Sequence, residues 1–321
     1  MPGVSNKPEA KAFRRDLTGG LPYRTFLNGG QTVDGRRRMN TEDRISGYFR
    51  SLSGGLPPYL RALEKEACLE QVPIIRRQTQ EFLRFYLKAA RPKRILELGT
   101  AVGFSACLMA EYMPSEARLI TVEKVPVRIV AAKKNLAASP YADRIEMLTG
   151  DAIAVLKALC REPVLQDIGI FAPGRSPADQ GRAFAGYECR NIRPDGWLDG
   201  IFVWEPQEFR QFDLIFLDAA KAQYPSYLPY LVRLLAKDAV LITDNILQEG
   251  SVAESKFSIA RRDRTIHMRM REYLYTITHC RSLDTILLRD GDGMAVSRRT
   301  GEEDMFHEQE EAGASDAGRK S

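Results

Sequence analysis

Residues 212–228 read FDLIFLDAAKAQYPSYL, and residues 240–245 read VLITDN. Each stretch opens with a continuous apolar run, which is typical of a parallel strand covered on both faces of its sheet. Asp218 follows the first run, and Asp244 with Asn245 ends the second. Because open α/β sheets bind their ligands at the carboxyl ends of the strands, we expect these three side chains to lie at the functional edge.

Asp218, Asp244 and Asn245 offer hard oxygen ligands, which suit Mg²⁺ or another divalent cation. An alternative explanation is structural, since Asp and Asn after a strand also cap the helices that follow. The sequence pattern alone leaves both explanations open.

The composition indicates one main domain with extensions. The chain has 321 residues, of which 44% are hydrophobic, enough for one large core. It contains no run of eighteen apolar residues, and the beginning MPGVSNKPEA lacks the apolar core of a secretory signal, so we expect no membrane partner. The five Cys are scattered without a C-x-x-C pair, which favours a reducing, cytoplasmic location over a disulfide scaffold.

Changes in composition suggest the domain boundaries. We expect a disordered leader over 1–40, an α/β domain over 41–300 and a disordered acidic tail over 301–321. Within the domain, residues 161–211 are rich in Gly and Pro and predict an irregular insertion. We expect it to cover the edge opposite the functional one, because it precedes the amino end of the strand at 212.

Residues 96–105, LELGTAVGFS, predict a strand, a glycine-rich turn and the start of a helix, and residues 118–124, RLITVEK, predict the next strand. Gly99 and Gly103 allow the backbone to approach a ligand, and Glu123 is placed to accept hydrogen bonds from ribose hydroxyls. The turn is not the dinucleotide pattern G-x-G-x-x-G, because Ala101 stands at the second glycine position.

Residues 256–279, KFSIARRDRTIHMRMREYLYTITH, predict a basic amphipathic helix. Its cations are compatible with a polyanionic partner, although a solvated surface explains them equally well. We expect His267 and His279 on that solvated surface. Further along, Asp290-Gly291-Asp292-Gly293 predicts the turn of a β-hairpin that spans 283–299.

From Pro58 to Arg299, the insertion excepted, LELGTAVGFS, LDAAKAQYPSYL and LITDN together resemble the cation-dependent O-methyltransferases that include the catechol and caffeoyl-CoA enzymes. Within that family, LDAAKAQYP, RRDRT and DGDGMAVSRR look most like the bacterial tRNA 5-hydroxyuridine methyltransferases. The resemblance implies a class I methyltransferase fold, Rossmann-like and α/β, with helices on both faces of a seven-stranded, mostly parallel sheet. Its last strand would be antiparallel, and the protein would be a homodimer.

The resemblance also assigns site residues. The metal ligands fall on Asp218, Asp244 and Asn245, and Lys221 matches the general base of the catechol enzymes, so Lys221 and Asp218 are the catalytic candidates. The expected contacts with S-adenosylmethionine are Ile75, Glu97, Gly99, Gly103, Ser105, Glu123, Asp151 and Asp218. The candidate RNA contacts in the basic helix are Arg261, Arg262, Arg264, Arg269 and Arg271.

Three functions are compatible with these patterns. The basic helix and the wording of the motifs favour methylation of 5-hydroxyuridine at the wobble position of a tRNA anticodon loop. A small-molecule catechol is the alternative acceptor, because the same metal site serves both. A non-catalytic RNA-binding protein on this fold is disfavoured, because the metal and cofactor motifs are both complete.

Overall fold

The computed structural model describes residues 41–52, 54–161, 168–173 and 211–301. The predicted leader, the tail beyond 301, and residues 162–167 and 174–210 of the predicted insertion lie outside the described residues. The chain divides into two compact units, 1–55 and 56–321. The first unit contains the helix α1, Thr41–Leu52.

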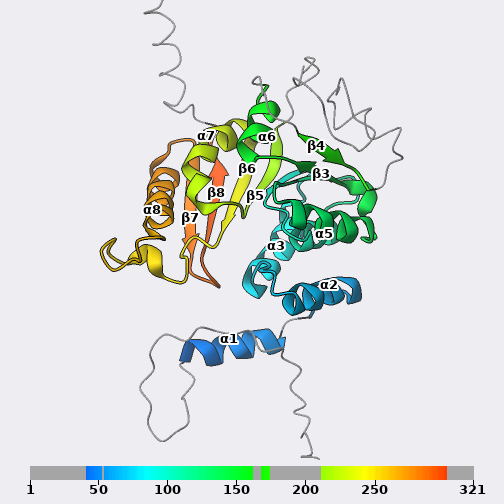
Figure 1. The fold of residues 1–321 in the computed structure, drawn as a ribbon, viewed down its shortest axis with the longest axis horizontal. Coiled ribbons are helices and arrows are strands. Elements are labelled where there is room, and N and C mark those ends of the chain that lie inside the picture. Colours follow the sequence, from blue (N-terminus) through cyan, green and yellow to red (C-terminus); the bar gives the residue numbers. More distant parts are fainter. Residues whose placement is uncertain (1–40, 53, 162–167, 174–210, 302–321) are drawn as a thin grey trace, which may run out of the picture. The chain divides into compact units, whose positions relative to one another are not determined.

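The second unit alternates helices and strands along the chain (Figure 1). Its described strands are β1 Arg94–Leu98, β2 Arg118–Glu123, β3 Ile145–Thr149, β4 Gly169–Phe171, β5 Phe212–Leu217, β6 Leu235–Asp244, β7 Leu283–Leu288 and β8 Met294–Arg299. Its described α-helices are α2 Pro58–Leu69, α3 Arg77–Ala90, α4 Phe104–Tyr112, α5 Pro126–Ala137, α6 Ala152–Leu159, α7 Tyr224–Leu234 and α8 Arg264–His279. Short 3-10 turns occur at η1 Ala142–Arg144, η2 Lys221–Gln223 and η3 Ser251–Ala253.

The described strands form one sheet in the order β4-β3-β2-β1-β5-β6-β8-β7. The pairs among β3, β2, β1, β5 and β6 are parallel, and the last strand of the chain, β8, runs antiparallel to both β6 and β7. This confirms the predicted sheet of seven strands. The structure adds an eighth strand, β4, which pairs antiparallel with β3 and lies inside the stretch predicted to be irregular.

Helices cover both faces of the sheet, as the continuous apolar runs predict. In β5, Ile215 and Leu217 pack into a core with α6, α7 and α8, whereas Leu214 and Phe216 pack into a second core with α2, α3, α4 and α5. Successive residues of a strand point to opposite faces, so a central strand between two helical layers has to be apolar at every position.

The order of the strands creates a crevice between β1 and β5. From β1 the chain builds outward through β2 and β3, and then returns to place β5 on the other side of β1. Ligands of such sheets bind at this reversal point, outside the carboxyl ends of the strands. No helix in the described part of the chain combines the length and the apolar composition that a membrane crossing requires.

Candidate functional site

The crevice begins where β1 and β5 end side by side. Gly99 follows β1 with a φ of +106°, and a Cβ atom at this position would lie 2.1 Å from the backbone oxygen of Asp218. The amide of Asp218 in turn donates to the carbonyl of Leu98 at 2.9 Å. Only glycine fits this approach and this backbone conformation, so Gly99 brings the predicted cofactor loop against the predicted metal ligand.

Glu123, at the carboxyl end of β2, is buried and held by the backbone. Its Oε2 accepts from the amide of Ala101 at 3.0 Å, and its Oε1 accepts from the amides of Lys124 and Val125 at 2.8 and 2.9 Å. Ala101 has a φ of +48°, so the carboxylate also supports a strained turn. These bonds fix the orientation of Glu123, which lines the cavity described below.

The other predicted cofactor residues lie farther from the open space. Glu97 is fully buried in β1 and accepts from the hydroxyl of Thr121, and its burial raises the pKa to about 7. Asp151 caps α6, since its Oδ1 accepts from the amide of Ile153 at 3.0 Å, and its Oδ2 pairs with Lys124 at 3.2 Å. Asp151 therefore performs the structural role of a helix cap.

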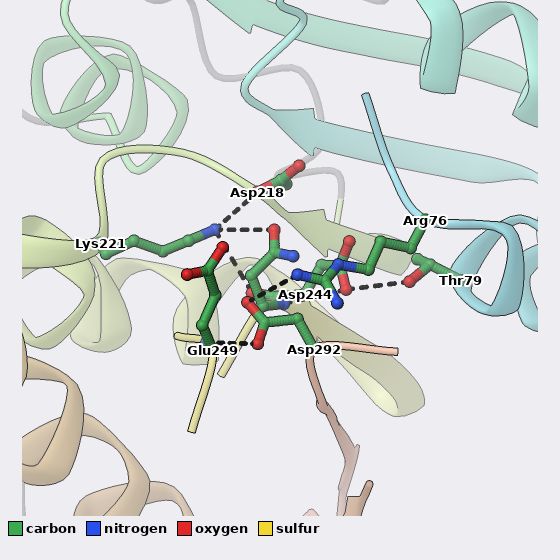
Figure 2. Close-up of polar contacts among 8 residues, drawn as sticks. Arg76, Thr79, Asp218, Lys221, Asp244, Glu249 and Asp292 are labelled. Carbon is green, nitrogen blue, oxygen red and sulfur yellow. Dashed lines mark hydrogen bonds and ion pairs between the residues drawn. The ribbon is translucent and has the colours of Figure 1, made fainter. Parts of the chain in front are cut away.

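The predicted metal ligands converge. Figure 2 shows Asp218 and Asp244 near the side chain of Lys221. The Nζ of Lys221 lies 2.7 Å from Oδ1 of Asp218, 3.2 Å from Oδ1 of Asn245 and 3.5 Å from the carbonyl oxygen of Asp244. Asn245 adopts a φ of +56°, so the chain turns sharply at the end of β6 to present this amide.

Charge and burial perturb the pKa values of this cluster. Burial lowers the pKa of the Lys221 ammonium, but Tyr224, at 3.2 Å from Nζ, and Asp218 raise it more, so the pKa lies above its ordinary value. Burial and the nearby charge of Asp218 raise the pKa of Asp244 to about 6. As it stands, the cluster keeps Lys221 protonated, which suits a side chain that holds Asp218 and Asn245 in place.

The residues fit a divalent cation. Asp244 is 1% exposed, and its Oδ2 has no hydrogen-bond partner among the described residues, while its Oδ1 accepts from Thr79 at 3.0 Å and from the amide of Asn245 at 2.9 Å. A buried carboxylate oxygen without a partner is costly, and a cation would satisfy it. The described residues contain no cluster of three His, Cys, Asp or Glu, because the predicted ligand set has two carboxylates and one amide.

A cavity of about 900 Å³ opens over the predicted cofactor loop, at the ends of β1 and β2, and over the predicted metal ligands, at the ends of β5 and β6. Five predicted site residues line it: Gly99, Glu123, Asp218, Lys221 and Asn245. The predicted residues that do not line it are Ile75, Glu97, Gly103, Ser105, Asp151 and Asp244. Gly150 and Ala152 on either side of Asp151, and Ile74 and Arg76 on either side of Ile75, do line it, so these two predictions lie one residue from the cavity wall.

The basic helix is shorter than predicted and divides into two groups of arginines. It begins at Arg264, so Lys256, Arg261 and Arg262 precede it. Arg264 and Arg271 are engaged by the fold, because Arg264 donates to the carbonyl of Ile259 at 3.0 Å and Arg271 donates to that of Val252 at 3.2 Å. Both side chains anchor the loop before α8, so they are less available to bind RNA phosphates.

Arg261, Arg262 and Arg269 are exposed, as is Arg271. Arg262 pairs with Asp263 at 3.4 Å and Arg269 pairs with Glu272 at 2.9 Å. The prediction for the histidines holds for His279 and is wrong for His267. His279 is exposed, whereas His267 is 2% exposed and lies 3.2 Å from the carbonyl of Glu254. Its ring therefore packs beneath the loop that precedes α8.

Sequence reasoning missed two residues that touch predicted site residues: Thr79 contacts Asp244, and Tyr224 contacts Lys221. Thr79 binds Asp244 from α3, where it occupies the same buried face as Leu83 and Leu87. A polar residue on that apolar face was the available signal. Tyr224 is fully buried and holds Lys221 from the start of α7, and its ring packs edge-on against Tyr273 of α8.

Residues 50–172 and 200–300 match the model of the O-methyltransferase family, and these segments make up more than half of the chain. The chain belongs to the O-methyltransferase family. The match confirms the O-methyltransferase family that the motifs predicted, while the likeness to tRNA 5-hydroxyuridine methyltransferases stays a prediction. The stretch without a match, 173–199, is narrower than the predicted insertion.

Curated relatives of this O-methyltransferase family member include two catechol O-methyltransferases. The one from Niastella koreensis is 27% identical over 174 residues, which cover 54% of this chain and 58% of that enzyme. The one from Mycobacterium tuberculosis is 25% identical over 214 residues, which cover 66% of this chain and 76% of that enzyme. The matched region thus spans less than two thirds of the Niastella enzyme.

Solved structures confirm the fold. The O-methyltransferase from Bacillus cereus in complex with SAH has a TM-score of 0.59 at 19% identity, over 80% of this chain and 97% of that one. The SAH-bound methyltransferase PaMTH1 from Podospora anserina has a TM-score of 0.60 at 21% identity, over 85% of this chain and 99% of that one. Both therefore share the architecture of the second unit.

Proposed function

We propose that this protein transfers the methyl group of S-adenosylmethionine to one of two adjacent oxygens on an acceptor ring. The observation that carries the proposal is the contact between Gly99 and Asp218, because it joins the cofactor loop to the metal ligands in one cavity. Membership in the O-methyltransferase family supports the same reaction.

Asp218, Asp244 and Asn245 would hold the divalent cation. When bound, Mg²⁺ or a similar ion supplies the positive charge that lowers the pKa of a coordinated hydroxyl and fixes its orientation. The methyl group then moves from the sulfonium sulfur to the acceptor oxygen, the hydroxyl proton leaves, and S-adenosylhomocysteine is the second product. Thr79 orients Asp244 in this arrangement.

Lys221 is positioned to orient two ligands and to face the acceptor. Its ammonium contacts Asp218 and Asn245 and lines the cavity. A role as general base requires the neutral amine, which the adjacent carboxylate disfavours. We therefore propose that Lys221 holds the ligands as an ammonium. Once a bound cation neutralises their charge, Lys221 would lose its own proton to solvent and, as the neutral amine, would receive the acceptor proton.

For the acceptor, we propose 5-hydroxyuridine at the tRNA wobble position, whose 5-hydroxyl and 4-carbonyl are adjacent oxygens. The support is an exposed group of cations and one aromatic ring close in sequence to the cavity wall, which we term the cationic rim: Lys256, Phe257, Arg261, Arg262 and Arg269. Residues 258–260, between Phe257 and Arg261 in the chain, line the site cavity, whereas Lys256, Phe257 and Arg269 line a second cavity.

The chemistry of the cationic rim suits a single-stranded RNA loop. Phe257 is 79% exposed, with the Lys256 ammonium 5.3 Å from its ring centroid, and the Arg262 side chain is 88% exposed. Exposed aromatic rings stack on unpaired bases, and arginines bind the flanking phosphates. A catechol is the second candidate acceptor, because two relatives are named catechol O-methyltransferases.

The experiment that tests the acceptor has two arms. Purified protein, Mg²⁺ and labelled S-adenosylmethionine are incubated with an anticodon stem-loop that contains 5-hydroxyuridine, and separately with free catechol. We expect the label in 5-methoxyuridine, identified by mass spectrometry of the nucleosides. Methylation of catechol with an untouched stem-loop would replace the RNA proposal, and no transfer to either would contradict the proposed reaction.

The cationic rim is tested by the salt dependence of stem-loop binding. Removing Arg261 and Arg262 together should flatten the slope of log K against log salt by about 0.7 per lost phosphate contact, since each contact releases counterions. Phe257→Ala should weaken binding without changing the slope. The control is Arg298→Ala, which removes an exposed charge near the opposite ends of the strands, where Arg298 pairs with Val240. Equal slopes in all variants would show that the cationic rim is a solvated surface that binds no RNA phosphate.

A further inference from the structure

The turn between β7 and β8 holds the loop that follows the metal ligands. Three amides of the loop 246–250 donate to two residues of the turn: Ile246 to the carbonyl of Gly293 at 3.2 Å, Leu247 to the carbonyl of Asp292 at 2.9 Å, and Glu249 to Oδ1 of Asp292 at 2.6 Å. Asp292 is 7% exposed and lines the cavity wall. Its carboxylate thus binds a loop residue directly.

The contact is close, and the loop is strained. A Cβ atom on Gly293 would lie 2.5 Å from Cγ of Leu247, so glycine is required at this position. Gln248, Glu249 and Gly250 have φ values of +49°, +57° and +88°, and each non-glycine residue in this region costs about 1–3 kcal/mol. Such a conformation persists only where surrounding contacts fix it, and the bond from Glu249 to Asp292 is such a contact.

Asp292 also faces the opposite wall of the cavity. Its Oδ2 lies 4.0 Å from the guanidinium of Arg76, which precedes α3, and Figure 2 shows Arg76 extending toward Asp292. The neighbouring Gly291 lies against the side chains of Arg76 and Gln78. One carboxylate therefore lies between the loop after Asn245 and the segment that leads to Thr79, and these two segments carry contacts to the cation ligands.

We propose that Asp292 is a positioning residue for the acceptor. It fixes the backbone of Glu249 and so sets the acceptor wall of the cavity, without contact to the cofactor loop. The inference rests on the proposed methyl transfer, and it gives the hairpin turn a function that the resemblance left unassigned. Glu249, held in this way, is exposed and lines the cavity.

The experiment compares Asp292→Ala, Asp292→Asn and a control, Asp290→Ala, which truncates an exposed acid of the same turn. Asp292→Asn keeps an oxygen that accepts from the Glu249 amide but removes the charge that faces Arg76. We expect Asp292→Ala to raise the KM for the acceptor on the order of tenfold, with kcat less affected and the Kd for S-adenosylmethionine unchanged. Asp292→Asn should recover most of the loss, and Asp290→Ala should match the parent.

Amide hydrogen exchange measures how firmly the loop 246–250 is held, and it needs no acceptor. The Glu249 amide should exchange faster in Asp292→Ala than in the parent, and at the parent's rate in Asp292→Asn and Asp290→Ala. Unchanged exchange in a folded Asp292→Ala variant would overturn the inference, as would a parental KM. If the parent methylates no acceptor with adjacent oxygens, the proposed reaction fails, while the exchange rates still decide whether Asp292 fixes the loop.

Discussion

The cofactor half of the site, at the ends of β1 and β2, and the acceptor half, at the ends of β5 and β6, satisfy their carboxylates differently. At the end of β2, Glu123 accepts from three backbone amides, so its position is complete within the chain. At the end of β6, Asp244 is also buried, yet one of its oxygens finds no partner in the part of the chain that the structure describes, and its pKa is raised to about 6. The cofactor half is preorganised, whereas the acceptor half carries a charge that the protein alone does not balance.

This difference implies a division of labour. Under the proposed function, we expect the preorganised half to bind S-adenosylmethionine whether or not a cation is present, because Glu123 is already held by three amides. We expect the acceptor half to need the cation before it holds the acceptor oxygens. Substitutions in one half should therefore change one step and spare the other.

The largest effect is expected from Asp244→Ala. Losing a ligand removes transition-state stabilisation of several kcal/mol, so kcat/KM for methyl transfer should fall by at least ~10³-fold. The affinity for S-adenosylmethionine, measured by calorimetry on the same protein, should change little. A parallel loss of both quantities would contradict the division between the halves.

Glu123→Ala should give the converse result. Losing hydrogen bonds to a charged group costs about 1–3 kcal/mol, which should appear as weaker S-adenosylmethionine binding, while the affinity for the cation stays at the parent's value. Asp143→Ala, an exposed acid in η1, is the control. Unchanged cofactor affinity in Glu123→Ala would exclude the ribose contact.

Thr79→Val removes the hydroxyl that orients Asp244 and keeps the volume of the side chain. We expect cation affinity to fall on the order of tenfold, the lower end of the range for an outer-shell partner. Thr276→Val, on the solvent side of α8, controls for the substitution itself. A cation affinity equal to the parent's would show that Thr79 supports α3 packing only.

The last prediction concerns stability and not binding or turnover: burial raises the pKa of Glu97 from 4.5 to about 7. The folded state holds this proton more tightly than the unfolded state, so the contribution to stability is full below pH 4.5 and is lost as the pH rises to 7. Glu97→Gln should remove that fall. Urea unfolding of the cofactor-free protein from pH 4 to pH 8 checks this, and parallel curves for parent and variant would contradict it.

The sequence predicted the sheet well, because its signals are local. The apolar runs before Asp218 and Asp244 identify buried strands, and the strand ends place both acids at one edge. The glycines of the turn likewise predicted the hairpin of β7 and β8. The strand β4 could not be predicted, since three residues carry too little periodicity and the pairing with β3 is tertiary.

The site was less predictable where it depends on contacts between distant segments. Thr79 and Asp244 are 165 residues apart, and no local pattern links them. The arginines of the predicted basic helix look alike in sequence, but Arg264 and Arg271 are bound by carbonyls of the preceding loop. Asp151 was predicted as a cofactor contact, which stays a prediction; the structure shows that it also caps α6, a role that the same residue type commonly serves.

The most direct test of the central claim measures methyl transfer and cofactor affinity in the same samples of the parent protein, with Mg²⁺, with excess chelator, and with Mg²⁺ restored. The account predicts that chelator abolishes transfer to the acceptor, that restored Mg²⁺ recovers it, and that the Kd for S-adenosylmethionine stays constant throughout. Transfer that continues undiminished in chelator would contradict the account, because Asp218, Asp244 and Asn245 would then have no cation to hold.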